Sequence, residues 1–341
     1  MSGNASTQQN NNSRKENSFE PLKAVKDEEY QIEGEDWGGL KPQIAKKKLK
    51  IGDKIGEYGI YMGERGIYDV RNRLNDLTGR EWAIFTKSWF IHNPPPRDDK
   101  EILHPAKFPE SMIADFIEFF TKKGELVLDP MAGTGSTLVA CDKTRRKGVG
   151  IELVKKWADI ASQRTKQVVI CGDARHLKQL LAQVGIYQVD FCITSPPYWN
   201  MLRKSRGHIL SLQKQRKEKG LEEYYSDDPN DLGNIEDYDT YLNALCDIFS
   251  KVHDLLRPGR YLVVICQNIL TPEGEMIPFA WDLAKKLSKT YILKQEKLWL
   301  QDNKLLGIWG YPSRYVSNVH HHYCLIFEKN HRLNEKVDSG P

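Results

Sequence analysis

Apolar runs of strand length alternate with amphipathic runs of helix length over the last two thirds of the chain. Within the amphipathic runs, apolar residues recur with the helical period, as in the helix expected over 237–256. Pro258 and Gly259 end that helix. Because strands that alternate with helices form right-handed crossovers, the pattern predicts an α/β domain whose seven-stranded, mostly parallel sheet has helices on both faces. The expected strands are 125–129, 148–153, 168–173, 189–195, 261–268, 291–300 and 321–329.

Composition sets the expected domain limits. Residues 1–20 are rich in Asn, Gln and Ser and carry too few apolar groups to offset the entropy of ordering, so a disordered tail is expected. An N-terminal extension is expected over 21–100, and the main domain over 101–330. A long polar and largely basic insertion interrupts the main domain at about 201–236, and residues 331–341 form a short C-terminal tail.

Charge and cysteine usage exclude few classes of protein. The formal net charge is +4, from 50 Lys and Arg against 46 Asp and Glu, which permits a nucleic-acid partner without requiring one. The six cysteines form no CxxC pair and are typical of reduced core residues. No apolar run approaches a membrane span, and the N-terminus lacks the apolar region of a signal peptide, so a cytoplasmic protein without a membrane partner is expected.

A glycine-rich turn follows the first expected strand. The stretch LVLDPMAGTGSTLVA places Asp129 at the end of the strand, and Gly133 and Gly135 in the turn that leads into a helix. Ligands of open parallel sheets bind beyond the carboxyl ends of the strands, where glycines allow close approach to the backbone. The turn is therefore a candidate cofactor loop, although a tight turn between a strand and a helix favours glycine regardless of function.

Two later acids favour the cofactor interpretation. Glu152 ends the second strand, where a carboxylate can accept hydrogen bonds from a ribose diol, and Asp173 ends the third strand. Three successive strands thus deliver an acid to one rim. The turn has neither the GxxxxGK[ST] nor the full GxGxxG pattern, so a cofactor with a ribose and no pyrophosphate fits best.

Two motifs and one upstream segment resemble those of the DNA amino-methyltransferases, a family that uses S-adenosylmethionine. DPMAGTGS resembles the cofactor motif DPFxGxG, TSPPY resembles the catalytic motif [DNS]PPY, and HPAKFPE resembles the segment that closes over the methionine end of the cofactor. The resemblance covers about residues 70–330 and implies a Rossmann-like class I methyltransferase fold with one antiparallel strand. Met131 replaces the usual Phe, and the order of the motifs differs from the commonest order among cytosine 4-amino enzymes.

The resemblance also implies roles for single residues. Asp129, Gly133 and Gly135 would line the methionine part of the cofactor, Glu152 would bind the ribose hydroxyls, and Asp173 would bind the adenine amino group. The candidate cofactor-binding residues are Asp129, Pro130, Met131, Ala132, Gly133, Gly135, Glu152, Asp173, Lys107 and Phe108.

The candidate catalytic residues Ser195, Pro196, Pro197 and Tyr198 lie at the end of the fourth strand. An exocyclic amine of a base is a poor nucleophile, because its lone pair is delocalised into the ring. The Ser195 hydroxyl and the Pro196 carbonyl would accept its hydrogens and localise that pair, and Tyr198 would stack on a base flipped out of the duplex. The alternative is that PPY merely ends a strand and that its aromatic neighbours pack on the core.

Candidate nucleic-acid contacts follow residues 195–198, the catalytic corner. Basic residues at the start of the insertion can reach phosphates beside a flipped base, although a solvated helix explains the same charge run. Trp199 would extend the stacking surface that Tyr198 offers to the base. A second candidate recognition loop spans about 301–320. Consecutive histidines at 320–322 alternate across a strand, so no metal is expected. The candidate DNA contacts are Trp199, Arg203, Lys204, Arg206 and Arg314.

The serine of TSPPYW bears on the substrate, since SPPY members of the family are associated with cytosine and DPPY members with adenine. The expected function is site-specific methylation of the 4-amino group of cytosine in double-stranded DNA, which makes a cognate restriction endonuclease a candidate partner. Three alternatives stay open: transfer to the adenine 6-amino group, transfer to an amino group of RNA, and a non-catalytic nucleic-acid-binding module.

Overall fold

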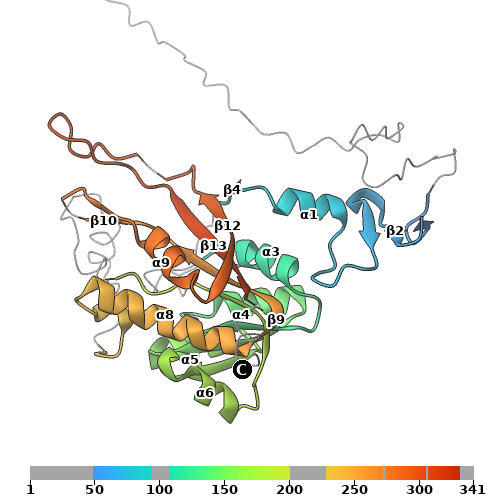
Figure 1. Cartoon of the computed structure of the whole chain (residues 1–341), viewed down its shortest axis with the longest axis horizontal. Helices are drawn as coiled ribbons and strands as arrows, with labels where there is room; N and C mark the ends of the chain where they lie inside the picture. The colour runs from blue at the N-terminus through green and yellow to red at the C-terminus, as the bar shows by residue number, and fades with distance from the viewer. Residues whose placement is uncertain (1–48, 94–107, 200–227, 272, 305, 331–341) are drawn as a thin grey trace, which may run out of the picture. The chain divides into compact units, whose positions relative to one another are not determined.

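The computed structural model describes residues 49–93, 108–199, 228–271, 273–304 and 306–330 (Figure 1). They belong to one compact unit, Leu49–Pro341. The other unit, Met1–Lys48, lies outside the described residues, and so do the expected tails and most of the basic insertion.

One large sheet organises this unit. Its strand order is β4-β12-β13-β9-β8-β5-β6-β7, and β13 is antiparallel to both of its neighbours while every other pair is parallel. The mostly parallel sheet with one antiparallel strand is therefore confirmed. Its strands are β4 (Trp89–Ile91), β5 (Leu126–Asp129), β6 (Lys147–Glu152), β7 (Val168–Cys171), β8 (Val189–Thr194), β9 (Leu256–Cys266), β12 (Tyr291–Leu300) and β13 (His321–Lys329).

Two details differ from the expected sheet. An eighth strand is present because β4, from the N-terminal extension, pairs with the edge strand β12. The strand β9 begins at Leu256, before Pro258 and Gly259. Its pairing with β8 shifts register between Val189 and Phe191, and this irregularity accommodates a proline that a regular ladder would exclude.

Helices cover both faces of the sheet (Figure 1). Successive residues of the central strand β8 contribute to different apolar clusters, since Phe191 packs with α3 and α4 whereas Cys192 packs with α6, α8 and α9. This alternation explains why the central strands read as continuous apolar runs. The helices are α3 (Glu110–Phe120), α4 (Ser136–Thr144), α5 (Lys155–Arg164), α6 (Leu177–Gln183), α8 (Tyr238–Leu255) and α9 (Phe279–Leu287).

Smaller elements precede and interrupt this core. Residues 54–69 form a three-stranded antiparallel sheet, and a helix over 79–85 begins at a capping box between Thr78 and Glu81. A short hairpin follows β9. These elements are β1 (Lys54–Ile55), β2 (Gly59–Tyr61), η1 (Gly63–Arg65), β3 (Ile67–Asp69), α1 (Gly79–Phe85), η2 (Ala174–His176), η3 (Leu232–Asn234), β10 (Ile269–Leu270) and β11 (Met276–Ile277).

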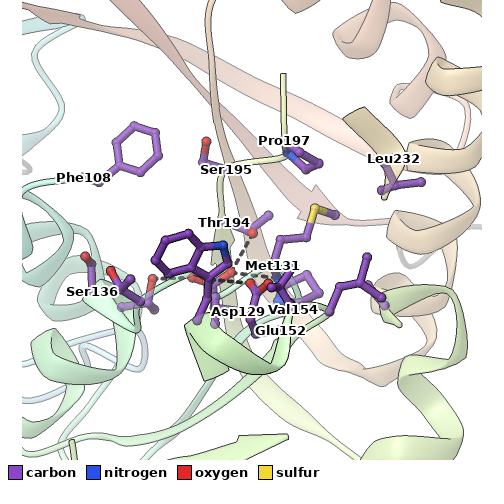
Figure 2. A pocket seen from close by; sticks show the side chains of 18 of the residues that line it. Phe108, Asp129, Met131, Ser136, Glu152, Val154, Thr194, Ser195, Pro197 and Leu232 are labelled. Atoms are coloured by element: carbon purple, nitrogen blue, oxygen red, sulfur yellow. Dashed lines mark hydrogen bonds between the residues drawn. The ribbon is translucent and has the colours of Figure 1, made fainter. Parts of the chain in front are cut away.

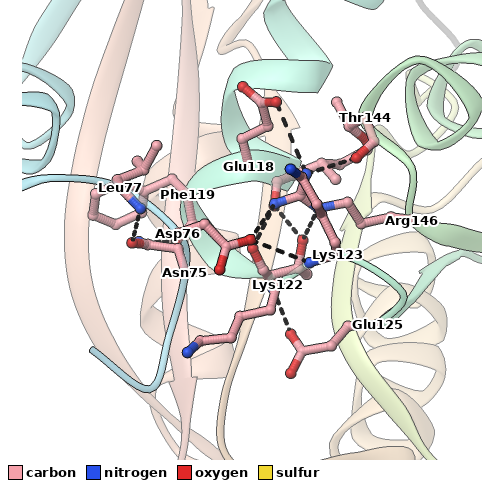
Figure 3. Close-up of polar contacts among 12 residues, drawn as sticks. Asn75, Asp76, Leu77, Glu118, Phe119, Lys122, Lys123, Glu125, Thr144 and Arg146 are labelled. Carbon is pink, nitrogen blue, oxygen red and sulfur yellow. Dashed lines mark hydrogen bonds and ion pairs between the residues drawn. The ribbon is translucent and has the colours of Figure 1, made fainter. Parts of the chain in front are cut away.

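Polar contacts join the N-terminal extension to the loop after α3 (Figure 3). The Asn75 side chain donates to the Phe119 carbonyl at 2.6 Å, and the Lys123 N–H donates to Asp76 at 3.4 Å. Arg146 is buried beside them and donates to the Thr121 carbonyl at 2.8 Å. The described part of the extension, residues 49–93, therefore belongs to the same structural unit as the sheet.

Arg146 provides a test of this junction. Besides the Thr121 carbonyl, its guanidinium donates to the Thr144 carbonyl at 2.7 Å. Arg146→Met would leave these buried carbonyls without their donor, so we expect the free energy of unfolding to fall by about 3 kcal/mol. Lys155→Met is the matched control, since Lys155 is 77% exposed and its ion pair with Asp159 is screened by solvent, so the free energy of unfolding should change little. Equal denaturation midpoints for the two variants would contradict the assigned role.

Candidate active site

The carboxyl ends of β5, β6 and β8 surround a pocket at one rim of the sheet (Figure 2). It receives side chains from each strand end and from the turns that follow. The described lining comprises Phe108, Ile113, Asp129, Pro130, Met131, Ala132, Gly133, Thr134, Ser136, Thr137, Glu152, Leu153, Val154, Trp157, Asp173, Ala174, Thr194, Ser195, Pro197, Asn230, Asp231, Leu232 and Ile265. The structure thus brings the glycine turn, the two later acids and the candidate catalytic residue Ser195 to one cavity.

Asp129 lies buried at the centre of this site. Its carboxylate accepts hydrogen bonds at 2.6 Å from the hydroxyl of Thr137 in α4 and at 2.6 Å from the hydroxyl of Thr194 in β8. The Met131 N–H donates to it at 3.1 Å. Burial raises the pKa of Asp129 in spite of these donors. The carboxylate therefore joins the glycine turn to the strand that carries Ser195.

Glu152 performs a similar function on the neighbouring strand. One carboxylate oxygen accepts from the Gly133 N–H at 2.8 Å, and the other accepts from the Val154 N–H at 2.9 Å. Each oxygen keeps a second lone pair for a ligand. Burial raises the pKa of Glu152 to about 7, against these two hydrogen bonds and with a smaller contribution from Asp129.

The two predicted glycines are required by backbone conformation. Gly133 and Gly135 have φ values of 52° and 80°, in the left-handed region that favours glycine. A Cβ at Gly135 would also lie 3.0 Å from the Cβ of Ala161 in α5. Gly135 provides no side-chain cap for α4, so the N–H groups of the first helical turn can receive an anionic ligand group beside Ser136.

Asp173 lines the pocket, but Arg175 also binds it. The guanidinium of Arg175 donates to the Asp173 carboxylate at 2.6 Å, and the Arg175 N–H donates to it at 2.8 Å. Burial acts to raise the pKa of Asp173, but the hydrogen bonds from Arg175 outweigh this effect and lower it. Arg175 also donates to the Asn230 carbonyl at 3.0 Å, so this ion pair connects two walls of the pocket.

Residues 230–232 form a wall that sequence reasoning missed. Asp231 is buried and caps η3 by accepting from the Gly233 N–H at 2.9 Å, which places Leu232 in the lining. The sequence had assigned these positions to the polar insertion, and the only available signal was the capping pattern of Asp before Leu and Gly. Trp157, Val154 and Ile265 were also missed, since their spacing is that of core residues.

Phe108 is placed in the lining, where its ring contacts those of Trp299 at 5.7 Å and His322 at 6.2 Å between centroids. In the view of Figure 2, Phe108 and Ser195 lie toward one side of the pocket, and Met131, Val154 and Leu232 lie toward the other. The candidate Lys107 lies outside the described residues. The pocket is therefore aromatic near Ser195 and aliphatic around Leu232.

Helix α8 and the segment before it hold the catalytic corner. The Tyr241 hydroxyl donates to the Pro197 carbonyl at 2.6 Å. The indole N–H of Trp199 donates to the Ile235 carbonyl at 2.8 Å, and its ring packs edge-on against Tyr238. These contacts fix the orientation of the Trp199 ring, and the DNA contact expected from the sequence stays a prediction.

The remaining candidates are less directly placed. Ser195 and Pro197 belong to the described lining, whereas Pro196, which is buried, and Tyr198 do not. The candidates Arg203, Lys204 and Arg206 lie outside the described residues.

Arg314 lies in the loop between β12 and β13, where it donates to the Glu273 carbonyl at 3.0 Å. In the part of the chain that the structure describes, no group of His, Cys, Asp or Glu side chains could hold a metal ion. None of the described helices is long and apolar enough to cross a membrane.

The order of strands, the single antiparallel strand and the position of the pocket define a Rossmann-like class I methyltransferase fold. A family model described as DNA methylase matches residues 8–163. The matched range includes Asp129 and Glu152 and ends before Ser195. It supports the DNA methylase family, with S-adenosylmethionine as the cofactor, and it does not test the SPPY motif.

Similar curated proteins include one orphan methyltransferase and two type II methyltransferases. The orphan methyltransferase M.BamHII of Bacillus amyloliquefaciens is 33% identical over 94 residues, which are 27% of this chain and 36% of that protein. M.BglI of Bacillus subtilis is 33% identical over 98 residues, which are 28% of this chain and 27% of that protein. M.Cfr9I of Citrobacter freundii is 44% identical over 61 residues, which are 18% of this chain and 20% of that protein. The alignments thus span little more than a third, at most, of these relatives.

Solved structures with a related fold include TrmN from Thermus thermophilus, with a TM-score of 0.39 and 14% identity over 65% of this chain and 48% of that chain. A DNA modification methylase from the same species has a TM-score of 0.30 and 20% identity over 50% of this chain and 58% of that chain.

The raised pKa of Glu152 predicts that cofactor affinity depends on pH. Ribose hydroxyls would donate to the ionised carboxylate, so affinity should rise by about 10-fold between pH 6 and pH 8 as a group with a pKa of about 7 ionises. Folding has the opposite sign, because a raised pKa gives a stability contribution that is complete at low pH and is lost as pH rises through about 7.

Calorimetric titration with S-adenosylhomocysteine from pH 6 to pH 8 measures this dependence. The control is Glu152→Gln, whose affinity should be lower at pH 8 and should vary much less with pH. An identical pH dependence in the two proteins would show that another group titrates.

Proposed function

We propose that this protein transfers a methyl group from S-adenosylmethionine to the 4-amino group of cytosine in double-stranded DNA. The observation that carries the proposal is the Asp129 carboxylate, which joins the glycine turn to the strand bearing Ser195. A cofactor held by the turn and an amine held at Ser195 would therefore share one rigid frame. Such positioning of two reactants is a large part of catalysis in a bimolecular transfer.

The described residues fit S-adenosylmethionine. The first turn of α4 offers N–H groups to the carboxylate of its methionine part, next to Thr134 and Ser136. The Glu152 carboxylate can accept from ribose hydroxyls, and the lining acids Asp173 and Asp231 would be the acceptors for the adenine amino group. The aliphatic part of the pocket, formed by Met131, Val154 and Leu232, suits the faces of the adenine ring. When bound, the cofactor supplies an activated methyl group.

The catalytic corner would prepare the amine. The Ser195 hydroxyl oxygen and the Pro196 carbonyl can accept its two hydrogens, which turns the lone pair toward the methyl donor. The Pro197 carbonyl is held by Tyr241, so the corner cannot swing away from the pocket. Tyr198 would stack on the flipped base.

Several finer points belong to the proposal. Cytosine is preferred to adenine because of Ser195, and duplex DNA is preferred to RNA because of the family match. The basic residues Arg203, Lys204 and Arg206 would contact phosphates. A cognate restriction endonuclease is the proposed partner, in which case the methyl groups would protect host DNA.

Ser195→Ala tests the catalytic role. Loss of one of two acceptors should reduce methyl transfer by at least about 10-fold and change cofactor affinity by less than about 3-fold. The measurement is transfer of labelled methyl groups to duplex DNA, with calorimetry for the cofactor. Ser288→Ala is the control, because that hydroxyl donates to a backbone carbonyl in α9. Unchanged transfer by Ser195→Ala would remove Ser195 from the reaction.

Mass spectrometry of nucleosides from cells that express the protein identifies the base. The proposal predicts 4-methylcytosine in DNA that is lost with Ser195→Ala. Detection of 6-methyladenine instead would replace cytosine by adenine, and modified RNA with unmodified DNA would overturn the proposal.

A further inference from the structure

The loop between β12 and β13 exposes an unusual number of large apolar side chains. Figure 1 shows this orange-red segment reaching away from the sheet beyond β10. Four of its residues are among the most exposed large apolar residues of the described chain: Leu306 (78%), Ile308 (84%), Tyr311 (81%) and Tyr315 (90%). A cluster of exposed apolar side chains on one segment is typical of an interaction site.

Internal hydrogen bonds hold this loop in one shape. The Asn318 side chain accepts from the Gly307 N–H at 2.9 Å and from the indole N–H of Trp309 at 3.0 Å. Its amide group donates to the Gly307 carbonyl at 2.9 Å. The polar groups of Asn318 and Trp309 are thus used to build the loop, which leaves its apolar side chains facing outward on a preorganised frame.

The loop is also fastened to the hairpin between β10 and β11. Arg314 donates to the Glu273 carbonyl at 3.0 Å. Gly274 has a φ of 90°, and a Cβ added there would lie 2.9 Å from the Cγ2 atom of Val316, so the two segments are in close contact. Arg314 therefore contributes to this junction, and its contact with DNA stays a prediction.

Both ends of the loop lie at the rim that bears the pocket. Leu300 and His321, which flank it, pair with each other. The next residues of β13 run beside the carboxyl end of β9, where Tyr323 pairs with Cys266 and where Ile265 lines the pocket. A DNA duplex whose base entered the site over Ser195 would pass the same rim.

We propose that this loop is a wedge that opens the duplex, inserting Ile308, Tyr311 and Tyr315 where the target base leaves the stack. The inference rests on the proposed function. Aromatic faces can stack on the neighbouring bases, and apolar side chains at unstacked steps stabilise a distorted duplex. The occupant is DNA because the loop begins and ends at the rim that bears the pocket and offers exposed aromatic and apolar side chains on a fixed frame. It supplies stacking, since its Asn318 and Trp309 polar groups are already bonded within it.

The test compares two substrates, prepared once sequencing has located a site that the unmodified enzyme methylates. One is a fully paired oligonucleotide duplex, and the other has an abasic position opposite the target base, which makes flipping easier. The combined variant Ile308→Ser/Tyr311→Ser/Tyr315→Ser should lose about 10-fold or more of its methyl transfer on the paired duplex, and less than about 3-fold on the abasic one. Cofactor affinity should be unchanged.

Tyr187→Ser is the matched control, since Tyr187 is 69% exposed and precedes the opposite end of β8. Equal losses on the two substrates, or no loss on either, would overturn the wedge. A loop variant that is monomeric when the unmodified protein is dimeric, with normal transfer, would reassign the loop to self-association. If the unmodified protein transfers no methyl group to any DNA, the proposed function itself fails.

Discussion

The site depends on the hydrogen bonds that the buried carboxylate of Asp129 accepts. This carboxylate accepts from the Met131 N–H in the glycine turn, from Thr137 in α4 and from Thr194 in β8, so three segments that diverge from the rim are fixed to one point. A carboxylate buried without these donors would be strongly destabilising, which explains why an acid at this position requires hydroxyl-bearing residues around it. Glu152 repeats the arrangement one strand away, with backbone N–H groups as donors.

The sequence predicts those parts of the fold and site that are set by local patterns. Continuous apolar runs identify the strands of a sheet covered on both faces, and acids at the ends of successive strands must meet at one rim because parallel strands share their direction. Gly133 and Gly135 were identifiable because a strand-to-helix turn requires positive φ. The antiparallel strand and the roles of the motifs came from resemblance to a family.

Other features depend on contacts between distant segments and have no local signal. Leu232 lines the pocket because Asp231 caps a short turn, and the ring of Trp199 packs against that of Tyr238 in α8. The edge strand β4 owes its place to pairing with β12, more than 200 residues later in the chain. Such long-range pairings are decided by packing, which a periodic pattern does not encode.

Calorimetric titration of the full-length protein with S-adenosylmethionine tests the central claim most directly. The unmodified protein should bind one molecule per chain. Thr194→Val, which removes the donor that links Asp129 to the catalytic strand, should bind about 10-fold more weakly, because a hydrogen bond to a buried carboxylate is lost. Thr144→Val, which alters a buried threonine bonded within α4, should bind normally. No binding by the unmodified protein, or equal binding by Thr194→Val, would contradict the account.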